Sequence, residues 1–199
     1  MKIVLASKSP RRIELLRGLG WKFDIIPSQK AEHIDEHLAP KDIAMALSLQ
    51  KAEDIATKAS SSWVIGADTI VVINNRVLGK PKDELDAITM LESLEGKTHE
   101  VFTGVTVVSP DGKVLTKYAR SLVTMKHLTR QEIMSYIACG ESMDKAGAYA
   151  IQGKGTLLIS SIEGDYFNIV GLPLELLSSM FAELGVTLAE QFNGVNEDE

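Results

Sequence analysis

An aspartate stands inside the strongest predicted strand of the sequence. This strand covers residues 63–73, reads WVIGADTIVVI, and has Asp68 as its single charged side chain. Carboxylates are rarely buried in proteins unless they are paired with a cation or bind a metal ion. Asp68 could therefore hold a Mg²⁺-type ion or act as a general base on a water molecule. The alternative is a structural ion pair between Asp68 and a nearby lysine.

Hydroxyl and guanidinium groups gather in the segment SKSPRR, residues 7–12. An apolar run over residues 2–6 leads into a predicted helix, with Ser9 suited to the N-cap and Pro10 to the first helical position. The free N–H groups and the dipole of a helix start favour an anion, and guanidinium groups match phosphate oxygens. The alternative is an ordinary capped helix with solvated arginines. The candidate phosphate ligands here are Ser7, Arg11 and Arg12.

Two lysines and one glutamine are further candidate binding residues. Lys51 lies in a predicted helix, and Lys80 lies between glycine and proline in a rigid turn, where each could bind phosphate as a point charge. Gln152 stands in the small-residue segment DKAGAYAIQG, and its amide can donate to and accept from a base edge. Taken singly, each lysine could equally be a solvated surface residue, and the segment could simply be a glycine turn.

The composition excludes several classes of function. Lys and Arg number 21 against 27 Asp and Glu, and a net charge of −6 makes a nonspecific nucleic-acid binder a poor candidate. No apolar run approaches the roughly 20 residues of a membrane span, and the first residues lack the apolar core of a secretory signal. Because Cys139 is the single cysteine, no internal disulfide is expected, and a reducing cytoplasm is the simplest setting.

Alternating strand and helix patterns predict an α/β fold. The predicted strands cover residues 2–6, 21–27, 63–73, 77–78, 99–108, 114–128, 157–162 and 167–170. The predicted helices cover residues 10–18, 41–58, 82–94, 129–138 and 173–184, and a capping box of Thr129 and Glu132 starts the fourth. Since no helix separates the two long middle strands, part of the sheet should be antiparallel. We expect one domain over residues 1–190, built of two lobes around a cleft, and an acidic tail over residues 191–199.

The ordered set of these segments resembles the Maf family of nucleotide pyrophosphatases. The resemblance runs from Leu5 to about Leu184 and includes LASKSPRRIELL, VIGADTIV, LGKP, HEVFTGV, DKAGAYAIQG and NIVGLPLELL in family order. Each segment alone is weak, whereas the ordered set is specific. The resemblance implies a Maf/ITPase-like fold, with a mixed twisted sheet flanked by helices and two lobes around a central cleft. It also implies a homodimer.

The resemblance assigns roles to individual residues. Asp68 resembles the proton acceptor, and it would share a divalent metal ion with Glu32, although the segment QKAE at 29–32 is less acidic than the family pattern. The residues that resemble the phosphate- and substrate-binding set are Ser7, Arg11, Arg12, Lys51 and Lys80. The residues that resemble the markers of the dTTP/UTP branch are Arg11, Thr69 and Gln152. Ala150 replaces a glycine that is common in the family, which adds a methyl group near the expected base pocket.

The expected activity is therefore hydrolysis of dTTP and UTP to the monophosphate and pyrophosphate, with Mg²⁺ or Mn²⁺ as cofactor. Modified pyrimidine nucleotides are further candidate substrates, in a house-cleaning role. The expected partner is a small nucleotide, with no nucleic acid and no membrane. Two alternatives stay open at this stage. One is the same chemistry on 7-methyl-GTP or other modified nucleotides, and the other is a nucleotide-sensing regulator of septum formation.

Overall fold

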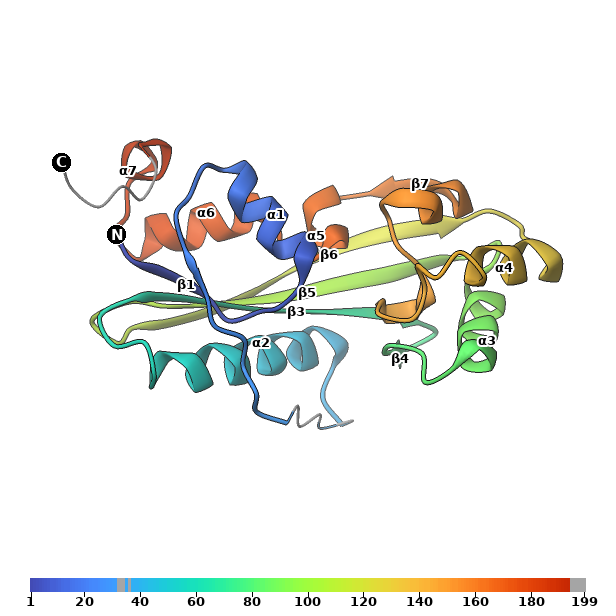
Figure 1. Ribbon diagram of the computed structural model, residues 1–199, viewed down its shortest axis with the longest axis horizontal. Coiled ribbons are helices and arrows are strands. Elements are labelled where there is room, and N and C mark those ends of the chain that lie inside the picture. The colour runs from blue at the N-terminus through green and yellow to red at the C-terminus, as the bar shows by residue number, and fades with distance from the viewer. Residues whose placement is uncertain (32–34, 36, 194–199) are drawn as a thin grey trace. The chain divides into compact units, whose positions relative to one another are not determined.

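The computed structural model describes residues 1–31, 35 and 37–193, and its strands form one mixed sheet (Figure 1). Within these residues the sheet has seven strands in the order β2-β1-β3-β5-β6-β7, with β4 paired to β3. The strands are β1 (Ile3–Leu5), β2 (Asp24–Ile25), β3 (Trp63–Ile73), β4 (Arg76–Leu78), β5 (Thr98–Val108), β6 (Val114–Met125) and β7 (Ile159–Glu163). β1 runs parallel to β2 and β3, whereas β4 is antiparallel to β3 and β7 is antiparallel to β6.

The helices flank this sheet, which confirms the predicted α/β class with a mixed sheet. They are α1 (Pro10–Gly18), α2 (Pro40–Ala56), α3 (Glu84–Leu94), α4 (Arg130–Ile137), α5 (Tyr166–Val170), α6 (Leu174–Glu183) and α7 (Leu188–Phe192). Two short 3₁₀ segments, η1 (Ala146–Ala148) and η2 (Gly153–Leu158), follow α4. None of the helices in the described ranges is both long and apolar enough to cross a membrane.

The chain divides into two compact units. Unit 1 comprises Met1–Asp68, Thr103–Ala119 and the chain from Gly171 onward. Unit 2 comprises Thr69–Phe102 and Arg120–Val170. The long strands β3, β5 and β6 contribute residues to both units. The expected cleft between two lobes stays a prediction.

The two faces of β1 and β3 pack against different helices of unit 1. Because side chains alternate along a strand, Leu5 and Ile65 point to one face, where they pack with α1 and α6 (Figure 1). On this face the ring of Phe181 lies 5.2 Å from Trp21 and 5.1 Å from Trp63. Val4 and Val64 point to the opposite face, where they pack against α2. The face of the sheet covered by α2 carries the candidate site.

The predicted strand over residues 167–170 is wrong, because these residues belong to helix α5. The carboxylate of Asp165 accepts a hydrogen bond of 2.8 Å from Phe167 N, and the Asp165 carbonyl accepts one from Ile169 N. A short apolar run fits a strand and a buried helical turn equally well. Asp165, just before the run, favours the start of a turn, and this selects the helix over the strand. The predicted strand over residues 21–27 is also reduced, to the two residues of β2.

The helix predicted over residues 173–184 is not the last one, because α7 follows it. Thr187 and Glu190 form a capping box at its start, the same T-x-x-E pattern that begins α4. Gln191 is buried and its side chain binds Ser178, while its carbonyl accepts a hydrogen bond from the Trp21 ring. The domain boundary drawn at residue 190 therefore falls within a packed helix.

Candidate active site

Asp68 forms an ion pair with Lys51 in unit 1. Asp68 lies on β3 and Lys51 on α2, and their side chains are 13% and 17% exposed. The carboxylate is therefore neither fully buried nor fully solvated. Since Lys51 is itself a predicted phosphate ligand, the ion pair brings two of the candidate site residues together.

Two glycines explain how α2 reaches this position. A Cβ atom at Gly66 would lie 2.8 Å from the backbone nitrogen of Ala52, and one at Gly104 would lie 2.6 Å from that of Met45. Such contacts are too short for real side chains, so only glycine lets the helix backbone lie directly on β3 and β5. Gly66 and Asp68 are two residues apart, which places the Asp68 carboxylate on the same face as α2.

Three hydroxyl groups hold α2 against the sheet one turn before Lys51. Ser48 Oγ lies 2.9 Å from Thr106 Oγ1, which lies 2.9 Å from Thr116 Oγ1. Ser48 and Thr106 are fully buried, so each hydroxyl needs these partners. Ser48 also donates to the Met45 carbonyl at 2.8 Å. These hydrogen bonds fix the rotation of α2 about its axis and its position on the sheet. They thereby fix the position of the Lys51 backbone.

The segment after β1 lies beside β3. Leu5 pairs with Ile65 in the parallel register, and Ala6 N donates to the Ile65 carbonyl at 2.8 Å. This register carries Ser7 toward the level of Asp68. Ligands of open α/β sheets bind outside the carboxyl ends of parallel strands. Ser7 follows the end of β1, and Asp68 lies on β3 just beyond Ile65, the last residue in register with β1.

Ser7, rather than Ser9, makes the hydrogen bonds in the turn before α1. Ser9 occupies the N-cap position as predicted, but its side chain makes no capping hydrogen bond. Ser7 Oγ accepts from Ser9 N at 3.2 Å and from Arg12 Nη1 at 3.4 Å. The buried Ser7 therefore shapes the turn and orients one predicted phosphate ligand.

Arg12 has a structural partner that the sequence did not indicate. Its Nε donates to the Gly171 carbonyl at 2.7 Å, which ties the start of α1 to the residues just before α6. Gly171 has φ of +122°, a backbone conformation that favours glycine. Arg11, in the first turn of α1, is half-buried. Unit 1 thus contains the Ser7–Arg12 pair just after β1 and the Lys51–Asp68 pair between α2 and the middle of β3.

Unit 2 contains the other predicted site residues. Lys80 is exposed, and the Gly79 carbonyl beside it accepts a hydrogen bond of 3.0 Å from Gly147 N. A Cβ atom at Gly147 would lie 3.0 Å from the Val71 side chain, two residues beyond Thr69 on β3. The segment leading to Gln152 therefore lies beside the Lys80 turn and against β3. Thr69 and Gln152 are both half-buried.

The predicted metal ligands are Asp68 and Glu32. Glu32 lies outside the described residues, and the described ranges contain no group of three or more His, Cys, Asp or Glu that could hold a metal ion. Mg²⁺ is commonly held by one or two carboxylates together with substrate phosphates. The partly exposed Asp68 carboxylate fits that arrangement, in which most remaining oxygen ligands come from the nucleotide and water.

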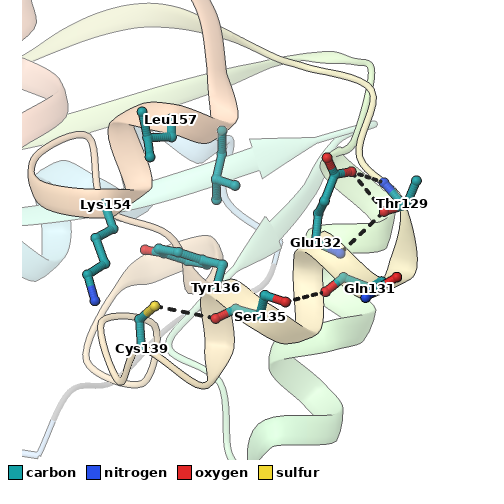
Figure 2. Close-up of a pocket in the computed structure, with 9 residues that line it drawn as sticks. Thr129, Gln131, Glu132, Ser135, Tyr136, Cys139, Lys154 and Leu157 are labelled. Atoms are coloured by element: carbon teal, nitrogen blue, oxygen red, sulfur yellow. Dashed lines mark hydrogen bonds between the residues drawn. The ribbon is translucent and has the colours of Figure 1, made fainter.

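A separate pocket of about 500 Å³ lies in unit 2 between α4 and η2 (Figure 2). Its lining is Thr129, Gln131, Glu132, Ser135, Tyr136, Cys139, Lys154, Leu157 and Leu158. None of these is a predicted site residue. The dashed bonds in Figure 2 include the capping box of Thr129 and Glu132, which has a structural role at the start of α4.

Sequence reasoning missed two buried polar residues, His99 and Tyr149. His99 Nε2 lies 2.7 Å from the Tyr149 hydroxyl, and burial lowers the pKa of His99 from 6.5 to about 4. Burial also raises the pKa of Tyr149. His99 lies on β5 and Tyr149 in the loop after η1, so no local pattern joins them. The available signal was the alternation of side chains along the strand, which places His99 on the same buried face as Val101.

The described elements define an α/β protein with a mixed sheet flanked by helices, and a solved structure shares this fold. The solved Ham1 protein of Staphylococcus aureus covers 92% of this chain, and the chain covers 100% of it, with a TM-score of 0.52. At 14% identity this likeness shows the fold alone.

The sequence comparisons are more specific. The family model described as Maf-like protein matches residues 2–184, so the chain belongs to the Maf-like protein family. A dTTP/UTP pyrophosphatase of Moorella thermoacetica is 51% identical over 186 residues, covering 93% of this chain and 96% of the relative. One of Dictyoglomus turgidum is 48% identical over 189 residues, covering 94% and 98%. The resemblance noted from the ordered motifs is confirmed.

Proposed function

We propose that this protein hydrolyses nucleoside triphosphates, dTTP and UTP in particular, to the monophosphate and pyrophosphate. The observation that carries the proposal is the Asp68–Lys51 ion pair between β3 and α2, in the same unit as Ser7 and Arg12. A carboxylate and cations within one unit suit the activation of water next to a polyphosphate. The name dTTP/UTP pyrophosphatase carried by relatives near 50% identity supports the substrate class.

The reaction joins water to the α-phosphate. The triphosphate binds through Arg11, Arg12, Lys51 and Lys80, and Ser7 orients the Arg12 guanidinium. Lys51 then has a phosphate as well as Asp68 within its reach, which leaves the carboxylate able to accept a proton from water. The water oxygen forms a bond to the α-phosphorus while the bond between that phosphorus and the bridging oxygen breaks. Pyrophosphate leaves, and its charge is offset by the cations.

A divalent cation, Mg²⁺ or Mn²⁺, belongs to the proposal. When bound, it would supply charge neutralisation on the phosphate oxygens and lower the pKa of a bound water. Asp68 is the described residue that would hold it, with Glu32 as the second proposed ligand. Activity that survives complete chelation of divalent cations would contradict this part of the proposal.

Recognition of the base is assigned to Thr69 and Gln152 in unit 2 and to Arg11 in unit 1. A glutamine amide can donate to a carbonyl of a pyrimidine and accept from its ring N–H. The chain leading to Gln152 lies beside the Lys80 turn at Gly147, which supports a role of both residues in the same nucleotide complex. Ala150, two residues before Gln152, is buried, so its methyl group is packed inside the protein.

The experiment is pyrophosphate release by the purified protein with Mg²⁺ or Mn²⁺, across dTTP, UTP, CTP, GTP, 7-methyl-GTP and ATP. Release from dTTP and UTP well above the others supports the proposal. Preference for 7-methyl-GTP would keep the chemistry and overturn the base assignment. A protein that binds these nucleotides but releases pyrophosphate from none of them would favour a nucleotide-sensing regulator.

The proposal also includes a homodimer that works in the cytoplasm. The family resemblance supports the dimer, and the single cysteine, Cys139, which is free and exposed, supports a reducing compartment. Sedimentation equilibrium should give twice the chain mass of 21.7 kDa. A species that stays at the mass of one chain over micromolar concentrations would contradict the dimer.

A further inference from the structure

The segment Gly147–Gln152, called here the Gln152 segment, is buried although it has little regular structure. Every residue from Gly147 to Ile151 is buried, and the backbone is left-handed at Gly147 (φ 69°) and Ala148 (φ 61°). Left-handed backbone at a residue with a Cβ atom persists only where surrounding contacts hold it. The conformation of this segment must therefore be fixed by contacts with other elements.

One such contact is the bond between His99 and Tyr149. His99 is the second residue of β5 and is 2% exposed. Its Nε2 lies 2.7 Å from the hydroxyl of Tyr149, which is 5% exposed. The two rings also pack edge to face at 5.3 Å. His99 Nδ1 has no hydrogen-bond partner among the described residues, so Tyr149 is the partner through which this imidazole is held. A buried polar pair of this kind fixes a single arrangement, because breaking it leaves polar groups unsatisfied.

Further bonds flank Gln152 on both sides. The Tyr136 hydroxyl accepts from Ala150 N at 3.1 Å, and Thr156 donates to the Ile151 carbonyl at 2.7 Å. Beyond Gln152, the Glu141 carboxylate accepts from two successive backbone N–H groups of η2, each at 3.1 Å. The backbone around Gln152 is thus held at each end, while the Gln152 side chain itself stays half-buried and accessible.

We propose that His99 and Tyr149 are positioning residues for selection of the base. They hold the Gln152 segment in the conformation that presents the Gln152 amide. This inference rests on the proposed function, in which Gln152 contacts the base. Loss of the bond should change the choice of nucleotide more than the rate of phosphate chemistry, because Asp68 and Lys51 are held by other contacts.

The test is the ratio of kcat/KM for dTTP to kcat/KM for CTP. Tyr149→Phe removes the hydroxyl alone, and we expect this ratio to fall about fivefold, the effect of one lost hydrogen bond near 1 kcal/mol. The fall should come mainly from KM for dTTP. His99→Leu should give the same loss, and His99→Gln, which keeps a side-chain amide to meet the Tyr149 hydroxyl, should retain most of the ratio.

A double-mutant cycle separates positioning from general damage. In a Gln152→Ala background, Tyr149→Phe should have no further effect on the ratio, because Tyr149 acts through Gln152. Ser121→Ala is the matched control, since Ser121 is a buried hydroxyl of the same unit bonded to the Asp165 carbonyl. This control should leave the ratio unchanged. Thermal melting of each variant checks that it is folded.

The outcomes distinguish the two levels of the proposal. A wild-type protein that selects dTTP, with Tyr149→Phe and His99→Leu selecting it equally well, overturns the inference alone. An equal loss of activity on every nucleotide, or an undiminished effect of Tyr149→Phe in the Gln152→Ala background, also overturns it. A wild-type protein with no preference among bases overturns the base recognition in the proposed function, and this inference with it.

Discussion

Gly66 and Ala52 are in such close contact that a Cβ atom on the glycine would lie 2.8 Å from the alanine backbone nitrogen. Ala52 follows Lys51 on α2, and Gly66 precedes Asp68 by two residues on β3. The contact between the two backbones therefore sets the distance over which the Lys51 ammonium reaches the Asp68 carboxylate.

The first prediction is that Gly66→Ala damages both stability and activity. The added methyl group must push α2 away from β3, and overpacking of this kind costs about 1–3 kcal/mol of unfolding free energy. The displaced helix should also loosen the Lys51–Asp68 pair and lower kcat/KM for dTTP at least about tenfold. Urea unfolding and steady-state kinetics measure the two effects. Gly18→Ala is the control, because a Cβ atom there meets nothing within 4 Å. Wild-type kinetics in Gly66→Ala would contradict this account.

The second prediction concerns acid sensitivity from His99. Burial lowers its pKa from 6.5 to about 4, so the folded state favours the neutral imidazole. Between these values the unfolded chain binds the proton more strongly. The contribution of neutral His99 to the free energy of unfolding is therefore complete above pH 6.5. This contribution is lost as the pH falls toward 4, and the total loss is about 3 kcal/mol. Urea unfolding at a series of pH values should show this loss in the wild type and a smaller one in His99→Gln. Identical pH dependence in the two proteins would rule it out.

The third prediction is that Arg12→Lys is not conservative. Lysine cannot donate from an Nε to the Gly171 carbonyl and at the same time reach Ser7 and a phosphate. We expect the unfolding free energy to fall by about 1.5 kcal/mol and KM for dTTP to rise by roughly tenfold. Arg17→Lys, at an exposed position in the last turn of α1, is the matched control and should behave as wild type. Equal behaviour of the two variants would remove Arg12 from the site.

The fourth prediction tests the helix that ends the described chain. Thr187→Ala removes the capping box of α7 and should cost about 1 kcal/mol of unfolding free energy. Thr187→Ser keeps the hydroxyl and should cost much less. Helix α7 packs on Trp21 through Gln191, and these contacts do not involve Asp68 or Lys51. The value of kcat/KM should therefore stay unchanged. A large loss of activity with an unchanged melting temperature would contradict this purely structural role.

Much of the fold and part of the site could be predicted from local signals. Asp68 stands out because a charge interrupts an apolar strand, and the paired lysine was one of the two interpretations of that signal. The capping box of α4 was predicted and is confirmed. The same pattern at Thr187 and Glu190 was overlooked, because no long apolar periodicity follows it in a helix of five residues.

What could not be predicted depends on packing between distant segments. The short apolar run at 167–170 was expected to be a strand and is a helix, since periodicity cannot decide so few residues. The partners Lys51 and Asp68 are 17 residues apart, and their contact requires glycine at Gly66 and Gly104 under α2. His99 and Tyr149 are 50 residues apart, so their bond follows from the tertiary structure alone.

The most direct test of the central claim is the fate of the water oxygen. The wild-type protein and the Asp68→Asn variant would each be incubated with dTTP and Mg²⁺ in ¹⁸O-labelled water. The products would then be analysed by mass spectrometry. The account predicts one ¹⁸O atom in the thymidine monophosphate, none in the pyrophosphate, and a loss of turnover in a folded Asp68→Asn protein. Label in the pyrophosphate, release of single phosphate, or full activity of Asp68→Asn would contradict it.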